Sequence, residues 1–184
     1  KEYKNTKYTG QITPTNQNVY VHDCVFQSCS SSLDGGAISC GNTVYKLLVE
    51  QTSFISCKTS SSTGGAIYFN SQTNGECILS RICGFGCSST YSGSYSYGQF
   101  SNTYTKNDVA YKNYINDSSI TRSSNWKKGS YETLRLQYGN ILCPSTNLTN
   151  NMCYYYTALL CWLTKGTGSP VSVTFCISYS SIIN

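Results

Sequence analysis

The sequence is poor in charge. Acidic and basic side chains make up 11% of its 184 residues, and only eight residues are acidic. Disordered chains are rich in charge and poor in aromatics, so the 17 tyrosines argue against that class. The net charge of +5 comes from scattered basic residues rather than a dense basic stripe, so we expect no nucleic-acid partner. No apolar run reaches the roughly 18 residues that a membrane-spanning helix needs, so we expect no transmembrane segment.

The sequence also has few stretches rich in Ala, Leu, Glu and Lys, which argues against long helices. Thr, Tyr, Val, Ile and Phe instead alternate with turn-forming Gly, Ser and Asn, a pattern that favours β-structure. The chain starts without Met and shows no recognisable signal peptide. We therefore expect a mature or excised segment of a longer protein.

One motif occurs twice. Gly-Gly-Ala-Ile stands at residues 35–38 and again at 64–67, a spacing of 29. The blocks before the two copies, residues 19–29 and 47–57, match at a spacing of 28, and each ends in Phe-x-x-Cys. The repeat unit is therefore an apolar strand, a Phe-x-x-Cys strand, a polar turn and a Gly-Gly-Ala-Ile strand.

Weaker units follow these two. In the third, Cys87 falls at the position of Cys29 and Cys57, Phe85 is displaced by one place, and residues 97–100 replace Gly-Ala-Ile. The last unit alternates apolar and polar residues with the period of a β-strand. The later units span residues 77–87 with 97–100, 113–124 with 132–138, 147–151 with 156–162, and 169–180.

A period near 30 with short apolar strands predicts a parallel β-helix, in which equivalent residues of neighbouring coils stack about 4.8 Å apart. Gly-Gly permits backbone angles that a Cβ forbids, so it marks a sharp turn into a strand. We expect Phe26 and Phe54 to stack. The predicted fold is all-β, a parallel β-helix of about six coils with 28–33 residues per coil. It covers residues 18–184, after an N-terminal cap or linker at residues 1–17.

The paired motifs resemble the Gly-Gly-Ala-Ile and Phe-x-x-Asn repeats of polymorphic membrane proteins, which also occur in large surface proteins of some parasitic protists. The sequence departs from the family where Cys29 and Cys57 replace Asn, and residues 148–151 keep the Asn without the Phe. The first half of the chain carries the resemblance. It implies a right-handed β-helix and an extracellular, adhesin-like role, and it implies no ligand.

Eleven cysteines, an odd number, favour an oxidising compartment. Equivalent Cα atoms one coil apart lie within the range that a disulfide requires, so Cys29 could bridge to Cys57. Local pairs and a ladder of reduced, buried thiols stay open as alternatives, and disulfides are favoured. The candidates are Cys24, Cys29, Cys40, Cys57, Cys77, Cys83, Cys87, Cys143, Cys153, Cys161 and Cys176.

Catalytic and metal-binding residues are not expected. Only Cys83 and Cys87 approach the spacing of zinc ligands, and the chain has a single His. His22 and Asp23 are neighbours on a strand and should point to opposite faces. The acidic residues form no pair of the kind that a glycosidase needs, and Asp34 fits a turn. We therefore expect neither a metal nor a cofactor, and a carbohydrate-active lyase or hydrolase is the alternative.

Two features could serve an extracellular role. Asn116 and Asn147 begin glycosylation sequons, which matter only if the protein is secreted by a eukaryote. Residues 89–104 are dense in Tyr, Ser and Gly, the composition of binding loops, although a plain loop is the alternative. The tyrosines of this candidate binding loop include Tyr91, Tyr95, Tyr97 and Tyr104.

The expected function is that of an extracellular structural or adhesive β-helix module of a cell-surface or secreted protein. Residues 173–184 stay apolar and strand-like to the end of the sequence. An uncovered edge of this kind accepts another strand, so we expect end-to-end stacking on neighbouring coils or on a second copy, which builds filaments. Surface glycans and host or cell-surface proteins are the other expected partners.

Overall fold

The computed structural model describes residues 1–60, 62–90, 99–123, 132–151, 159–162, 175–178 and 181–183. Every regular element in these residues is a β-strand, and none is a helix. The strands form four sheets, and all pairings between strands are parallel. The all-β prediction is confirmed.

Each repeat unit adds one strand to each of several sheets, always in the same order. The first sheet contains β1 (Glu2–Lys4), β3 (Asn18–His22), β7 (Lys46–Glu50), β11 (Glu76–Ser80), β15 (Lys112–Asn116), β18 (Asn140–Pro144) and β21 (Phe175–Ser178). The second contains β2 (Lys7–Tyr8), β4 (Val25–Gln27), β8 (Ser53–Ile55), β12 (Cys83–Phe85), β16 (Ser119–Thr121), β19 (Asn147–Thr149) and β22 (Ser181–Ile183).

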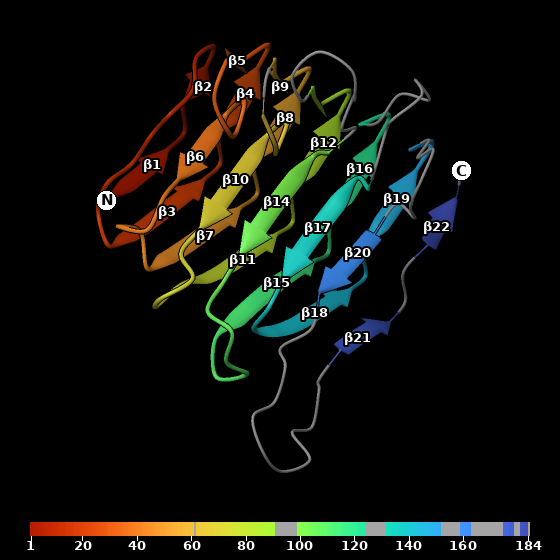
Figure 1. Ribbon diagram of the computed structural model, residues 1–184. Coiled ribbons are helices and arrows are strands. Elements are labelled where there is room, and N and C mark those ends of the chain that lie inside the picture. The colour runs from red at the N-terminus through yellow and green to blue at the C-terminus, as the bar shows by residue number, and fades with distance from the viewer. Residues whose placement is uncertain are drawn as a thin grey trace.

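The other two sheets are smaller. The third contains β6 (Ile38–Cys40), β10 (Ile67–Asn70), β14 (Ser101–Tyr104), β17 (Leu134–Gln137) and β20 (Leu159–Trp162). The fourth contains β5 (Ser30–Ser31), β9 (Lys58–Thr59) and β13 (Ser88–Ser89). Successive strands of each large sheet lie side by side from the red end of the ribbon to the blue end (Figure 1). This order is consistent with a parallel β-solenoid.

The strand register confirms the two repeat spacings. Phe26 lies opposite Phe54 in the β4–β8 pair, and Ile38 lies opposite Ile67 in the β6–β10 pair. Each side chain therefore packs against its equivalent in the next unit, and the inward side chains form one buried core.

The double glycine has two separate roles. Gly35 and Gly64 have positive φ angles of 70° and 68°, in the region that favours glycine. A Cβ at Gly36 would overlap the carbonyl oxygen of Gly65 in the next unit. The first glycine therefore permits the turn and the second permits the close approach of two backbones.

The third unit fills the core differently. Gly84 occupies the position of Phe54, and Phe85 lies one place outside it with 42% of its surface exposed. The space is filled by Phe100, whose ring packs edge-on against Phe54 with centroids 5.6 Å apart. The expected match of residues 97–100 to Gly-Ala-Ile is wrong by one place, because Ser101 is the residue opposite Ile67.

Both ends of the described chain contribute strands. β1 and β2 pair with β3 and β4, and Tyr8 stacks on Phe26 with centroids 4.8 Å apart. A capping role for residues 1–17 stays a prediction. β21 and β22 confirm strands within residues 175–183, whereas residues 171–174 lie outside the described part. The sequence analysis missed β18, since it began the fifth unit at residue 147.

Candidate functional site

The outward face of the first sheet carries a polar network next to a half-buried apolar row. The strands alternate inward and outward side chains, as the burial pattern of β3 and β7 shows. The register places one outward side chain of each strand in this middle row. Its members are Tyr20, Leu48, Ile78, Tyr114 and Leu142.

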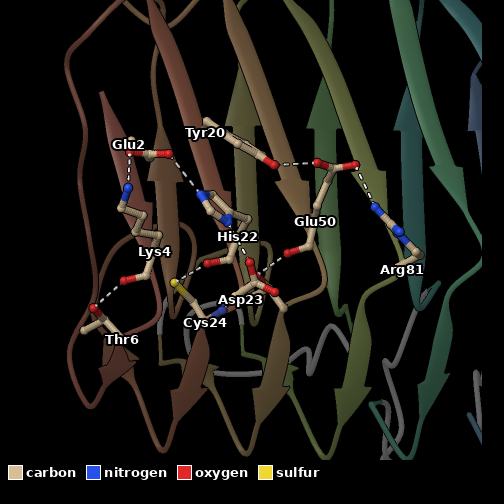
Figure 2. A network of polar contacts seen from close by, with 10 residues as sticks. Glu2, Lys4, Thr6, Tyr20, His22, Asp23, Cys24, Glu50 and Arg81 are labelled. Atoms are coloured by element: carbon tan, nitrogen blue, oxygen red, sulfur yellow. Dashed lines mark hydrogen bonds and ion pairs between the residues drawn. The ribbon is translucent and has the colours of Figure 1, made fainter.

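His22 lies between two carboxylates (Figure 2). Its Nδ1 atom is 2.7 Å from Oδ2 of Asp23, and its Nε2 atom is 3.0 Å from Oε1 of Glu2. The expectation that Asp23 points away from His22 is therefore wrong. Asp23 follows the end of β3 with a positive φ of 52°, and this turn brings its carboxylate back to the ring.

The two carboxylates set the protonation of this ring. Hydrogen bonds to Asp23 and then to Glu2 raise the pKa of His22 above its usual value. The bond from His22, followed by that from Lys4, lowers the pKa of Glu2. Both ring nitrogens are occupied, and the Cys24 thiol bonds the backbone oxygen of His22 at 3.1 Å, not the ring. The arrangement therefore favours the protonated form of the imidazole, and both of its ring nitrogens have a carboxylate partner.

A second cluster continues the network along the sheet (Figure 2). The hydroxyl of Tyr20 donates to Oε2 of Glu50 at 2.7 Å, and Arg81 donates to Oε1 of Glu50 at 3.3 Å. The hydrogen bond to Glu50 raises the pKa of Tyr20. The imidazole of His22 stacks on the Tyr20 ring, with centroids 4.3 Å apart and planes 21° apart. Tyr20 is thus fixed on one ring face and at its hydroxyl.

A hollow of about 420 Å³ lies beside this tyrosine, at the N-terminal end of the face. Its lining surface is mostly apolar, although three of the lining residues are charged. Its lining residues are Lys1, Glu2, Asn18, Val19, Tyr20, Lys46 and Leu48.

The sequence analysis missed the convergence of Glu2 and Asp23 on one imidazole. The sequence feature that could have revealed it is the alternation of polar and aromatic residues in Glu2-Tyr3-Lys4, a short strand pattern. The structure pairs this strand with Tyr20-Val21-His22. Asp34 fits the turn expected of it, because its Oδ1 atom accepts bonds from the backbone and hydroxyl of Thr63 at 3.1 and 3.0 Å.

The expected disulfides are not seen. The nine cysteines whose side chains the structure describes are all free thiols, and Cys153 and the Cys176 side chain lie outside the described part. At three equivalent positions each Sγ instead donates to a backbone oxygen of the previous unit. These bonds are Cys29 to Tyr8 at 3.5 Å, Cys57 to Phe26 at 3.4 Å and Cys87 to Phe54 at 3.5 Å.

Asn151 makes the same bond in a later unit. Its Nδ2 atom donates to the backbone oxygen of Ile120 at 2.8 Å, and its Oδ1 atom accepts from the backbone of Ser123 at 2.9 Å. The thiols of the earlier units therefore make the same kind of contact as the Asn151 amide at the equivalent position. This is the ladder of reduced cysteines that the sequence left open, and it uses the sulfur atoms as donors.

Most of the described thiols are buried, which makes them poorly reactive. Burial raises the pKa of Cys40 and of Cys29 to about 12, and it raises the pKa of Cys77 as well. Cys83, on the outward face of β12, is exposed. No three His, Cys, Asp or Glu side chains of the described residues gather as metal ligands, and no helix there could span a membrane.

The two sequons differ in accessibility. Asn116 is half-buried and donates to Ser80 Oγ at 3.0 Å, and the Ser118 hydroxyl is buried against the backbone oxygen of Asn116. Asn147 is exposed on β19. Glycosylation of either residue stays a prediction.

The candidate binding loop is described only at its end. Tyr104 lies on β14, with its ring edge-on to Tyr138 at 5.1 Å, and a hydrogen bond between the two raises the pKa of Tyr104 to about 12. Tyr91, Tyr95 and Tyr97 lie outside the described residues.

Comparisons with protein families, with curated proteins and with solved structures find no match to this chain. The functional assignment therefore depends on the geometry and on the repeat motifs.

Proposed function

We propose that this chain is a right-handed parallel β-helix that serves as a structural or adhesive module of an extracellular surface protein. The observation that carries the proposal is the strand order, in which each unit adds a strand to the same sheets in the same sequence. A solenoid of this kind offers extended, regular surfaces, which suit a structural or adhesive role. The Gly-Gly-Ala-Ile repeat and its resemblance to surface-protein repeats support the same assignment.

The polar side chains of the first sheet support a role without catalysis. Glu2 and Asp23 both bind His22, and Glu50 binds Tyr20 and Arg81. These contacts satisfy the carboxylates within the protein and order the face, which supports a structural role. The alternative is a carbohydrate-active lyase or hydrolase. Such an enzyme would need one of these carboxylates to leave its present partner and contact the substrate.

Free thiols are compatible with an extracellular location when they are protected from oxidation. The thiolate is the form that is oxidised, and a raised pKa keeps Cys29 and Cys40 protonated. The low charge and the exposed Asn147 sequon also support a surface protein.

We propose neighbouring β-helical coils as partners. β1 and β21 are the edge strands of the first sheet, and an edge strand presents backbone groups that another strand can pair with. Such head-to-tail pairing would extend the solenoid into a longer chain or a filament.

The experiment is to stain cells that produce the parent protein with an antibody raised against this chain, with and without permeabilisation. We expect staining of intact cells and loss of the signal after brief protease treatment. Staining that requires permeabilisation would overturn the extracellular assignment. In parallel, the purified protein is incubated with a panel of polysaccharides. New reducing ends or unsaturated products that disappear in Glu2→Gln would favour the enzyme instead.

A further inference from the structure

We propose that the hollow beside Tyr20 binds a neutral hexopyranose unit of a glycan. The inference rests on the adhesive role proposed above and gives that role a site and a ligand class. It depends on three features of the face: a fixed aromatic ring, an open space on one side of it, and a mixed set of polar groups around that space.

The ring is fixed before any ligand arrives. His22 covers one face of Tyr20, and Glu50 holds its hydroxyl at 2.7 Å. His22 is itself held at both nitrogens, by Asp23 at 2.7 Å and Glu2 at 3.0 Å (Figure 2). A ring that is already ordered costs little conformational entropy when a ligand stacks on it.

The hollow lies on the other face of this ring. Its lining includes Asn18, which precedes Tyr20 by two positions on β3, but not His22, which follows it by two. Side chains two positions apart on a strand share a face, so Asn18 and His22 flank Tyr20 from opposite sides. The hollow of about 420 Å³ falls within the range of roughly 300–1,000 Å³ typical of small-ligand sites.

The apolar part of the site suits one face of a pyranose. The ring of Tyr20 carries negative charge on its face, which attracts the weakly positive C–H groups of a sugar ring. Leu48, next to Tyr20 in the middle row, extends the apolar surface.

The charged and polar groups of the lining favour a neutral ligand. Asn18 offers an amide, Lys46 an ammonium and Glu2 a carboxylate, so both donors and acceptors are present for hydroxyl groups. Two of the three charged lining residues are paired within the protein, since Lys46 pairs with Glu76 at 2.8 Å and Glu2 pairs with Lys4 at 3.1 Å. The third, Lys1, holds its ammonium 5.5 Å from the centroid of the Tyr3 ring. The ammonium would repel a cation and the carboxylate would repel an anion.

Tyr114 provides a matched control. It occupies the same row two strands further on from Leu48, and its hydroxyl accepts a bond from Asn140 at 3.1 Å. It does not line the hollow. Its removal should therefore leave sugar binding unchanged.

The test is saturation-transfer NMR and titration of the whole chain with the methyl glycosides of glucose, galactose and N-acetylglucosamine. We expect at least one of them to bind, with transfer to the ring protons of the sugar. Tyr20→Ala should weaken binding about tenfold, the scale of one stacking contact. Tyr20→Phe should keep most of it, and Tyr114→Ala all of it. Leu48→Trp, which fills the hollow and keeps Tyr20, should also abolish binding.

Thermal unfolding of each variant shows whether it is folded, and Tyr20→Phe with Leu48→Trp still tests the site if Tyr20→Ala does not fold. Equal binding by the wild type, Tyr20→Ala and Leu48→Trp would overturn the proposal. So would binding of sulfated or acidic sugars only, or no binding to any of the three glycosides. None of these results bears on the surface location, which antibody staining measures separately.

Discussion

Phe26 and Phe54 stack with their ring centroids 5.2 Å apart and their planes only 6° apart. They occupy the same position in consecutive units, and both are fully buried. A spacing of 28 residues along the chain thus becomes a direct ring contact in the core.

Replacing Phe54 with Ala should cost about 3–5 kcal/mol of unfolding free energy, because a cavity opens between two rings. Urea unfolding measures the loss. Phe85→Ala is the control, since this side chain is 42% exposed and its ring makes a cation–π contact with Arg122. Its loss should stay below about 1 kcal/mol. Equal losses in the two variants would contradict the packing described.

Gly84 and Phe100 should be energetically coupled. A Cβ on Gly84 would lie 2.5 Å from Cε2 of Phe100, so Gly84→Ala should cost about 1–3 kcal/mol through overpacking. Phe100→Ala alone should cost about 3–5 kcal/mol.

The double variant Gly84→Phe with Phe100→Ala recreates the residues of the second unit, where Phe54 and Ala66 occupy the two equivalent positions. We expect the double variant to be more stable, by about 0.5–3 kcal/mol, than the summed losses of Gly84→Phe alone and Phe100→Ala alone would give. A double-mutant cycle measures this coupling, and strict additivity would show that the two positions do not share one space.

The thiols should be reduced in freshly isolated protein. Alkylation without reductant, followed by peptide mapping, should label Cys83 first in the folded state, because it is exposed. Cys29, Cys57 and Cys87 should react only after unfolding, since they are fully buried. Cys83→Ser should remove the fast-labelled peptide and leave the others. Peptides joined through any two of the three buried cysteines would restore the disulfide hypothesis.

Cys57→Asn should be tolerated better than Cys57→Val. Asn can donate to the backbone oxygen of Phe26 as Asn151 donates to Ile120, whereas Val leaves that buried oxygen without this donor. Urea unfolding compares the variants, and we expect a difference of about 1–3 kcal/mol. Greater stability of the Val variant would show that the thiol acts only as a small apolar group.

Stability should depend on pH through His22. Its folded pKa lies above the unfolded value of 6.5, so its contribution is complete below pH 6.5 and is lost as pH rises through the folded pKa. The pKa of Glu2 is lowered from 4.5, so its contribution is complete above pH 4.5 and is lost as pH falls through the folded value. The two together predict a plateau between these limits.

Because the chain has a single His, NMR titration of one imidazole signal reports this pKa directly. Unfolding at several pH values should show the decline above the plateau in the wild type and a smaller one in His22→Gln. A folded pKa at or below 6.5 would contradict the carboxylate contacts of Figure 2.

The sequence by itself determined the parallel pairing, the stacking of Phe26 on Phe54 and the turns at Gly35 and Gly64. In a fold where equivalent residues of successive units stack, two residues separated by one repeat length are in contact. The repeat length is therefore enough to predict these features. The repeat also indicated that Cys87 joins Cys29 and Cys57 at one position, which the β9–β13 register confirms.

Only the tertiary structure decided what these side chains do. Phe100 reaches the space at Gly84 from a different sheet, and Glu2 reaches His22 from a strand that the repeat alignment did not include. The Cα spacing of the cysteines permits a disulfide or a thiol that donates to a carbonyl, and in the structure the thiols donate to carbonyl oxygens. Periodicity fixes which residues are neighbours, whereas rotamers, turn angles and contacts across the core fix which atoms meet.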